Sequence, residues 1–135
     1  MLQFYFLSVF LNVLAGFLLF SGEEGGSLEW RSGSSLRDET SKLVVGIVSM
    51  ITGILKILSP IEGDVPVIGD LIPALAGFLC GFILVFEYYR LRSSIEDSEQ
   101  IEKIDRILIR NKKIIGAVAL AVAALHFLFP KVLFL

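Results

Sequence analysis

The stretch SKLVVGIVSMITGILKILSP, residues 41–60, decides the fold, because it recurs as NKKIIGAVALAVAALHFLFP at residues 111–130. The two copies align without a gap, so that Gly46 falls on Gly116 and both copies end in proline. Each copy is predominantly apolar over about the 20 residues that cross a bilayer as a helix. The repeat therefore predicts a duplicated unit inside a small membrane protein.

Four apolar runs are long enough to span a bilayer, which takes roughly 17–25 residues. They cover residues 2–20, 43–59, 70–89 and 114–129. Helices are expected, because backbone polar groups in hydrocarbon must be satisfied within the segment. The chain is 55% hydrophobic, whereas soluble domains are roughly 45–50% apolar. We expect an all-α fold, an integral membrane four-helix bundle that forms a single domain over residues 1–135.

The sequence LAGFL extends the repeat to the first and third spans, since it occurs at residues 14–18 and again at residues 75–79. Each half of the chain then consists of an LAGFL helix, a charged loop and a second helix that ends in proline. Units of two helices insert the same way up, as parallel repeats related by an axis near the membrane normal. The pattern predicts two tandem two-helix repeats in a pseudo-twofold bundle.

The charges in the loops predict the orientation. The long loops 21–42 and 90–113 carry most of the lysine and arginine, whereas the short loop 61–69 carries only Glu62 and Asp64 as charged residues. Positive charge is retained on the cytoplasmic side. We therefore expect both long loops in the cytoplasm, both termini outside, and a bacterial inner (plasma) membrane as the location.

The second long loop contains an amphipathic segment. Ile101, Ile104 and Leu108 form an apolar stripe, and Glu99 precedes Lys103 by four residues, the spacing of a helical ion pair. We expect a cytoplasmic helix that lies on the membrane or runs into the last span. A solvated structural helix is the alternative.

Small residues recur at helical spacing on one face of three predicted spans. Such stripes let helix backbones approach closely in lipid, so helix packing is their expected role and a ligand groove is the alternative. The residues are Gly46, Ser49 and Gly53 in the second span, Gly77 and Gly81 in the third, and Gly116, Ala119 and Ala123 in the fourth.

Few polar residues lie at membrane depth. Lys56 and His126 stand four places before the proline of each copy. Either Lys56 snorkels to the interface while His126 packs there, or both face an outer vestibule and bind an anionic group or relay protons. Mid-span Asn12 is expected to form an interhelical hydrogen bond, and Asp70 to cap the third span. The candidate polar site comprises Lys56, His126, Asp70, Asp64, Glu62 and Asn12.

The second span resembles a helix of the DoxX-like four-helix membrane proteins. The matching residues are Lys42, which stands in place of an arginine, Gly46, Gly53, Lys56 and Pro60. In that family the motif belongs to the first helix, whereas here it belongs to the second. The resemblance implies a four-helix membrane fold and a role as a partner of membrane oxidoreductase systems.

The sequence contains none of the common catalytic motifs. It has one histidine, one cysteine and no phosphate-binding loop, HExxH or CxxC. We expect no catalytic residue, metal or cofactor, and the net charge of −2 gives no reason to expect nucleic acid. The expected partners are the lipid bilayer and a homo-oligomer or larger membrane complex. Two functions remain open: a non-enzymatic accessory or scaffold subunit, and a small ion or solute channel or transporter acting as a homo-oligomer. A third class is a lipid-binding sensor, which would bind anionic lipid through Arg110, Lys112 and Lys113.

Overall fold

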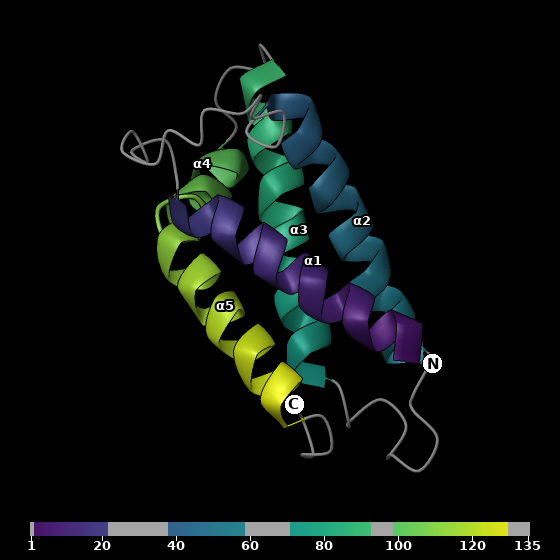
Figure 1. Ribbon diagram of the computed structural model, residues 1–135. Helices are drawn as coiled ribbons and strands as arrows, with labels where there is room; N and C mark the ends of the chain where they lie inside the picture. The colour runs from purple at the N-terminus through teal and green to yellow at the C-terminus, as the bar shows by residue number, and fades with distance from the viewer. Residues whose placement is uncertain (1, 22–37, 59–70, 93–98, 130–135) are drawn as a thin grey trace, which may run out of the picture.

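The computed structural model describes residues 2–21, 38–58, 71–92 and 99–129 (Figure 1). Within these residues the fold is entirely helical, which confirms the all-α part of the predicted fold class. The helices are α1 (Leu2–Ser21), α2 (Glu39–Leu58), α3 (Leu71–Arg92), α4 (Glu99–Leu108) and α5 (Lys112–Leu128).

Three of these helices are long and apolar enough to cross a membrane, judged by length and composition. They are α1 over Gln3–Ser21, α2 and α3. Helix α5 is apolar too, but its 17 residues stand at the lower limit of the roughly 17–25 residues that a span requires. Helix α4 has 10 residues, none of them buried, and it is the amphipathic helix predicted within the second long loop.

The helices begin and end further into the predicted loops than the apolar runs indicate. Helix α2 starts at Glu39, four residues before the predicted start. The Asp38 carbonyl accepts a hydrogen bond from the Lys42 N–H at 3.0 Å, and the Glu39 carboxylate complements the positive end of the helix dipole. Helices α3 and α5 likewise extend into the predicted loop 90–113. Charged residues can continue a helix where the apolar pattern stops, so hydropathy underestimates helix length here.

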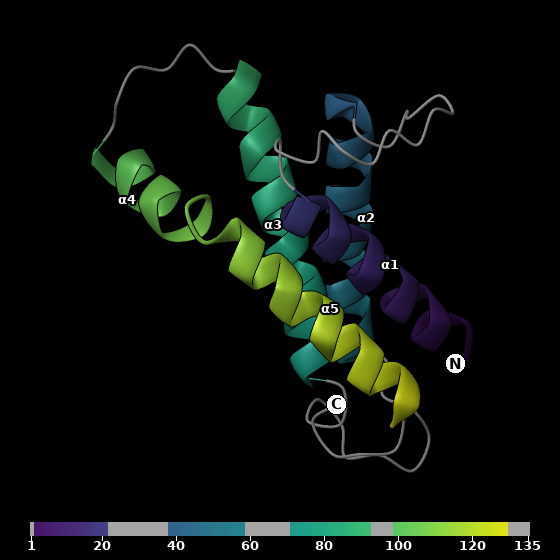
Figure 2. The same ribbon diagram turned by 60° about the vertical axis from the view of Figure 1, so that its left-hand side comes forward.

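The bundle has two distinct ends. Figures 1 and 2 show the start of α1 and the end of α5 at one end, together with the end of α2 and the start of α3. We call this the terminal end. Helix α4 lies at the opposite end, where it leads into the first turn of α5, and we call this the α4 end.

The helix contacts follow a pseudo-twofold pattern. The most extensive packing joins α2 to α3 and α1 to α5, and smaller contacts join α1 to α2, α1 to α3 and α3 to α5. Exchanging α1 with α3 and α2 with α5 turns the α2–α3 contact into the α1–α5 contact, and the α1–α2 contact into the α3–α5 contact. The α1–α3 contact is unchanged by the exchange. This is the arrangement that two tandem repeats of two helices would produce.

The small-residue stripes form the closest helix contacts, as predicted. A Cβ atom added to Gly81 of α3 would lie 2.5 Å from the Gly46 carbonyl oxygen of α2. A Cβ atom added to Gly116 of α5 would lie 2.6 Å from the Gly16 carbonyl oxygen of α1. All eight predicted packing residues are buried: Gly46, Ser49, Gly53, Gly77, Gly81, Gly116, Ala119 and Ala123.

The glycine contacts also correct the predicted alignment of the first and third spans. Gly16 meets Gly116, and the equivalent Gly46 meets Gly81, so Gly16 corresponds to Gly81 in the pseudo-twofold pattern. The LAGFL match instead pairs Gly16 with Gly77, which is wrong by about one helical turn. We assign equivalent positions in α1 and α3 by the glycine that each helix places against the repeated stretch. The LAGFL match is weaker evidence, because leucine, alanine and phenylalanine recur by chance in apolar helices.

The buried interior changes in polarity along the bundle. Towards the α4 end the core is apolar and consists of Ala15, Leu18, Leu19, Val45, Cys80, Ile83, Leu84 and Ala119. From the middle to the terminal end, polar side chains are buried between the helices: Ser8, Asn12, Ser49, Thr52, Lys56 and His126. The polar interior therefore occupies the half of the bundle that contains the predicted site.

Candidate functional site

Lys56 of α2 and His126 of α5 meet at the terminal end, with Nζ 2.6 Å from Nε2. Their side chains are buried, with 4% and 0% of the residue surface exposed. Each belongs to the buried face of its helix, which also carries the small residues that bring the backbones together. The structure thus joins the two residues that the repeat singled out, and Lys56 does not snorkel to the surface.

The contact between the two nitrogens restricts their protonation. A lysine ammonium can only donate, and a neutral imidazole has one nitrogen that accepts. A separation of 2.6 Å requires one hydrogen between Nζ and Nε2, donated either by the Lys56 ammonium or by the His126 ring. If both groups were protonated, two donors and two positive charges would face each other. The observed contact is compatible with at most one positive charge on the pair.

Tyr5 of α1 completes what we call the terminal-end cluster, Tyr5, Lys56 and His126. Its hydroxyl donates to the His126 carbonyl at 2.7 Å and approaches the Phe127 carbonyl at 3.2 Å. The last carbonyls of a helix lack intrahelical partners, so Tyr5 satisfies the end of α5. The Tyr5 ring lies 4.8 Å from the His126 ring and 5.2 Å from Lys56 Nζ, centroid distances typical of aromatic and cation–π contacts.

Sequence reasoning missed Tyr5, although a signal for it was present. Tyr5, Ser8, Asn12 and Ala15 recur at helical spacing on one face of α1, and all four are buried. This stripe of small and polar residues resembles those recognised in α2 and α5. A buried tyrosine also needs a partner for its hydroxyl, which the stripe predicts on a neighbouring helix.

A second polar contact lies near the middle of the bundle. Asn12 Nδ2 donates to the Pro73 carbonyl of α3 at 2.8 Å, and Ser49 Oγ of α2 donates to the Gly77 carbonyl at 2.9 Å. Gly77 makes room for this arrangement, because a Cβ atom there would lie 2.5 Å from Asn12 Oδ1. The predicted interhelical hydrogen bond of Asn12 is confirmed.

The predicted site residues do not all come together. Asn12 is seven residues from Tyr5 on α1, which places it about 10 Å deeper along the helix axis. It contacts α3 and not the terminal-end cluster. Glu62, Asp64 and Asp70 lie outside the described residues, so the acidic side of the predicted vestibule stays a prediction. Among the described residues, no group of histidine, cysteine and acidic side chains could hold a metal ion.

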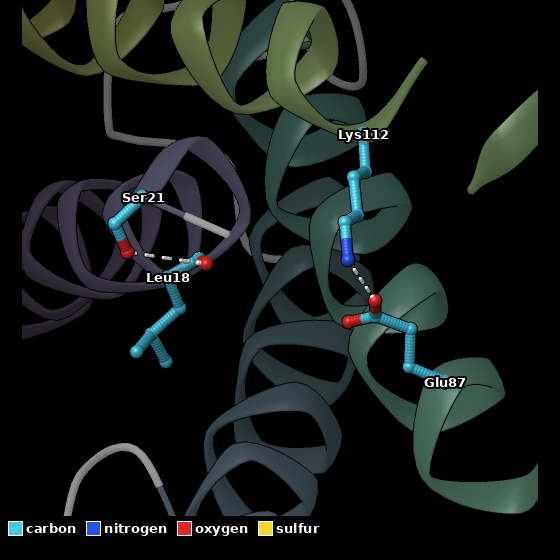
Figure 3. Close-up of polar contacts among 4 residues, drawn as sticks. All are labelled: Leu18, Ser21, Glu87 and Lys112. Carbon is cyan, nitrogen blue, oxygen red and sulfur yellow. Dashed lines mark hydrogen bonds and ion pairs between the residues drawn. The ribbon is translucent and has the colours of Figure 1, made fainter. Parts of the chain in front are cut away.

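At the α4 end of the bundle, an ion pair joins α5 to α3. Lys112 at the start of α5 donates to Glu87 of α3 at 2.5 Å, between partly buried side chains (Figure 3). In the same view the Ser21 hydroxyl approaches the Leu18 carbonyl in the last turn of α1.

One further ion pair joins α4 to α3, and another lies within α4. Arg90 of α3 pairs with Asp105 of α4, and the predicted pair between Glu99 and Lys103 is present at 2.9 Å. The α4 end therefore has an apolar core and ion pairs near the surface, whereas the terminal end has ionisable side chains buried inside the bundle.

Comparison with known proteins places the chain among relatives of uncharacterised function. An uncharacterised protein of Treponema pallidum (strain Nichols) is 38% identical over 138 residues, and the match covers 100% of both chains. No solved structure matches. A family model matches residues 1–126. The chain belongs to this uncharacterised family, whose model spans nearly all of its length.

Proposed function

We propose that the chain is a multi-pass membrane protein in which α1, α2, α3 and α5 cross the bilayer. The observation that supports this proposal is the reversed distribution of polarity. Ser8, Asn12, Ser49, Thr52, Lys56 and His126 are buried, whereas large apolar side chains are exposed on all four helices. Examples from each helix are Phe10, Phe17, Ile47, Ile51, Leu75, Leu79, Val118 and Leu125. In water these side chains would form an apolar patch that monomeric soluble proteins rarely expose.

The charges support an orientation with the α4 end in the cytoplasm. The described lysine and arginine residues between positions 90 and 113 belong to that end: Arg90, Arg92, Lys103, Arg106, Arg110, Lys112 and Lys113. At the terminal end the described basic side chains are those of Lys56 and His126, which are buried and together carry at most one positive charge. The positive-inside rule then places the termini outside the plasma membrane.

Within this membrane frame we propose a non-enzymatic accessory or scaffold role, in an oligomer or a larger membrane complex. The mid-bundle polar groups, Asn12 and Ser49, use their donors to join helices. Beyond them, towards the α4 end, Leu19, Ile83 and Leu84 close the interior of the described bundle. A chain that buries its polar groups in helix contacts, and presents apolar faces outward, is suited to assembly within the bilayer.

A small ion or solute transporter acting as a homo-oligomer is the second candidate, and the terminal-end cluster favours it. Ionisable residues inside a membrane are costly and commonly mark ion or proton pathways. Lys56 and His126 lie in the polar half of the bundle. The apolar core at the α4 end means that transport would require a second conformation in which that core opens.

Membrane insertion is tested by extraction of the expressed chain from isolated membranes with alkaline carbonate. Retention in the pellet is expected, and release into the supernatant would refute the proposal. A peripheral protein that is released under the same conditions serves as the control.

The two functions are separated by the variants Lys56→Leu and His126→Leu, with Lys103→Leu on exposed α4 as the matched control. The accessory role predicts a fixed oligomer or a copurifying membrane protein in mild detergent, and no solute flux in proteoliposomes. The transport role predicts flux that Lys56→Leu and His126→Leu abolish while Lys103→Leu retains it. Flux of that kind would overturn the accessory proposal.

A further inference from the structure

We propose that Lys56 and His126 form a proton-binding site, and that binding of a second proton separates the terminal ends of α2 and α5. The inference goes beyond the accessory and transport roles, because it needs only the buried contact between the two side chains. Its ligand is the proton, taken up by the imidazole of His126.

The first step is the proton count of the closed contact. With Nζ and Nε2 2.6 Å apart, one hydrogen lies between the nitrogens and the pair carries at most one positive charge. If the Lys56 ammonium donates this hydrogen, a second positive charge arises by protonation of Nε2, the ring nitrogen that faces Lys56. If the His126 ring donates it, Nδ1 takes up the first positive charge and the Lys56 amine the second. The resulting imidazolium and ammonium both donate and neither accepts, so they cannot keep this contact. Proton uptake and separation of the two side chains are therefore coupled by geometry.

The second step is the place of the contact in the bundle. Helices α2 and α5 are not among the helix pairs that pack extensively, so their side-chain contact joins the α2–α3 pair to the α1–α5 pair at the terminal end. Tyr5 binds the His126 carbonyl and therefore fastens α1 to the same turn of α5. When the contact between Lys56 and His126 opens, the end of α5 is expected to move together with α1.

Among the described residues, we consider the titratable groups that each packed helix brings towards the pair. Helix α1 contributes the Tyr5 phenol, whose hydroxyl donates to a carbonyl. The titratable residues of α3 begin at Cys80 in its middle and continue from Glu87 towards the α4 end. Helices α2 and α5 contribute Lys56 and His126 themselves. Among the described residues facing this site, histidine is the side chain whose unperturbed charge changes between pH 5 and 8.

The proton-binding step is measured on the full chain in phosphatidylcholine–phosphatidylglycerol nanodiscs. His126 is the only histidine of the chain, so labelling with ¹⁵N-histidine yields ring signals from this residue alone. At pH 8 we expect one protonated and one unprotonated ring nitrogen, and at pH 4.5 two protonated nitrogens. Failure of the ring to take up a proton over this range would overturn the proposal.

The separation is measured in the same nanodiscs by electron–electron distances between nitroxide labels at Leu58 of α2 and Leu128 of α5. Both side chains are exposed and stand two residues beyond Lys56 and His126. We expect the distance to increase by about 2–3 Å as the pH falls, because water must enter between the two cations. The increase should follow the same titration as the His126 ring. Labels at Thr40 and Ile114, towards the α4 end, should keep their distance.

The matched variant is His126→Gln. The introduced glutamine side chain can accept from Lys56 through its oxygen but cannot take up a proton, so the distance between the Leu58 and Leu128 labels should stay short at every pH. An equal pH-dependent increase in this variant would show that protons act elsewhere and would overturn the proposal. A constant distance in the wild-type chain despite protonation of His126 would overturn it as well. If the variant does not fold, the two wild-type titrations still decide.

Discussion

Replacing Gly116 by alanine tests whether close backbone contact sets the packing of α1 against α5. The new Cβ atom would lie 2.6 Å from the Gly16 carbonyl oxygen and 2.7 Å from the Phe20 amide nitrogen. Both are backbone atoms within α1, so neither can move without moving the helix. The substitution therefore forces α1 and α5 apart along one of the two most extensive helix contacts.

The magnitude follows from two opposing effects. Overpacking of this kind costs about 1–3 kcal/mol, because a gap of about 0.5–1 Å already forfeits a quarter to a half of each van der Waals contact. Alanine also gains about 1 kcal/mol over glycine in a helix interior. With a middle value of about 2 kcal/mol for the overpacking, the net expectation is a loss of about 1 kcal/mol in the free energy of unfolding.

The assay is unfolding in mixed micelles of increasing dodecyl sulfate fraction, followed by helical circular dichroism. Ala117→Gly is the matched control, because Ala117 is the next residue of α5 and is exposed. That control should lose about 1 kcal/mol through helix propensity alone. If Gly116→Ala is instead more stable than the wild type, propensity outweighs packing and the proposed α1–α5 contact is refuted.

Three further changes are measured in the same unfolding assay. Gly77→Ala should destabilise the chain, because its Cβ atom would displace the Asn12 amide; in a double-mutant cycle Asn12→Ala should recover part of the loss, and simple additivity would contradict the contact. Tyr5→Phe keeps the ring but removes the hydroxyl that satisfies the end of α5, so a loss of about 1 kcal/mol is expected, and an unchanged stability would contradict that role. Glu87→Gln should weaken the link to Lys112 by no more than about 1 kcal/mol, with a smaller effect at high salt; equal losses at low and high salt would exclude an electrostatic cause.

Part of the candidate site could be predicted because the sequence contains an internal repeat, whose two copies can be compared with each other. Lys56 and His126 occupy equivalent places in two aligned copies, on faces lined with small residues. A helical period of 3.6 residues converts that spacing into a shared face. The structure confirms that these faces are buried and brings the two side chains together. Tyr5 lies in α1, where the LAGFL match gives the wrong alignment with α3. The repeat therefore offered no equivalent residue in α3 that would have indicated Tyr5.

The resemblance of α2 to the DoxX-like proteins stays a prediction. It depends on a few residues of one helix, and the family model and the relative from Treponema pallidum name no function. A functional link to membrane oxidoreductases would be supported if such an enzyme copurified with the chain in mild detergent. Purification of the chain as a homo-oligomer without other proteins would contradict that link.

The sequence by itself determined the helical class, the approximate spans and the faces that pack, because apolar length and small-residue spacing are local properties of a helix. It could not determine which helices are neighbours. The pairing of α1 with α5 and of α2 with α3 depends on backbone approaches such as that of Gly16 to Gly116 and that of Gly46 to Gly81. Only the tertiary structure decides these approaches, since many pairs of apolar helices offer similar surfaces. The same packing places Lys56 against His126 and makes a proton-sensitive contact out of two residues 70 positions apart.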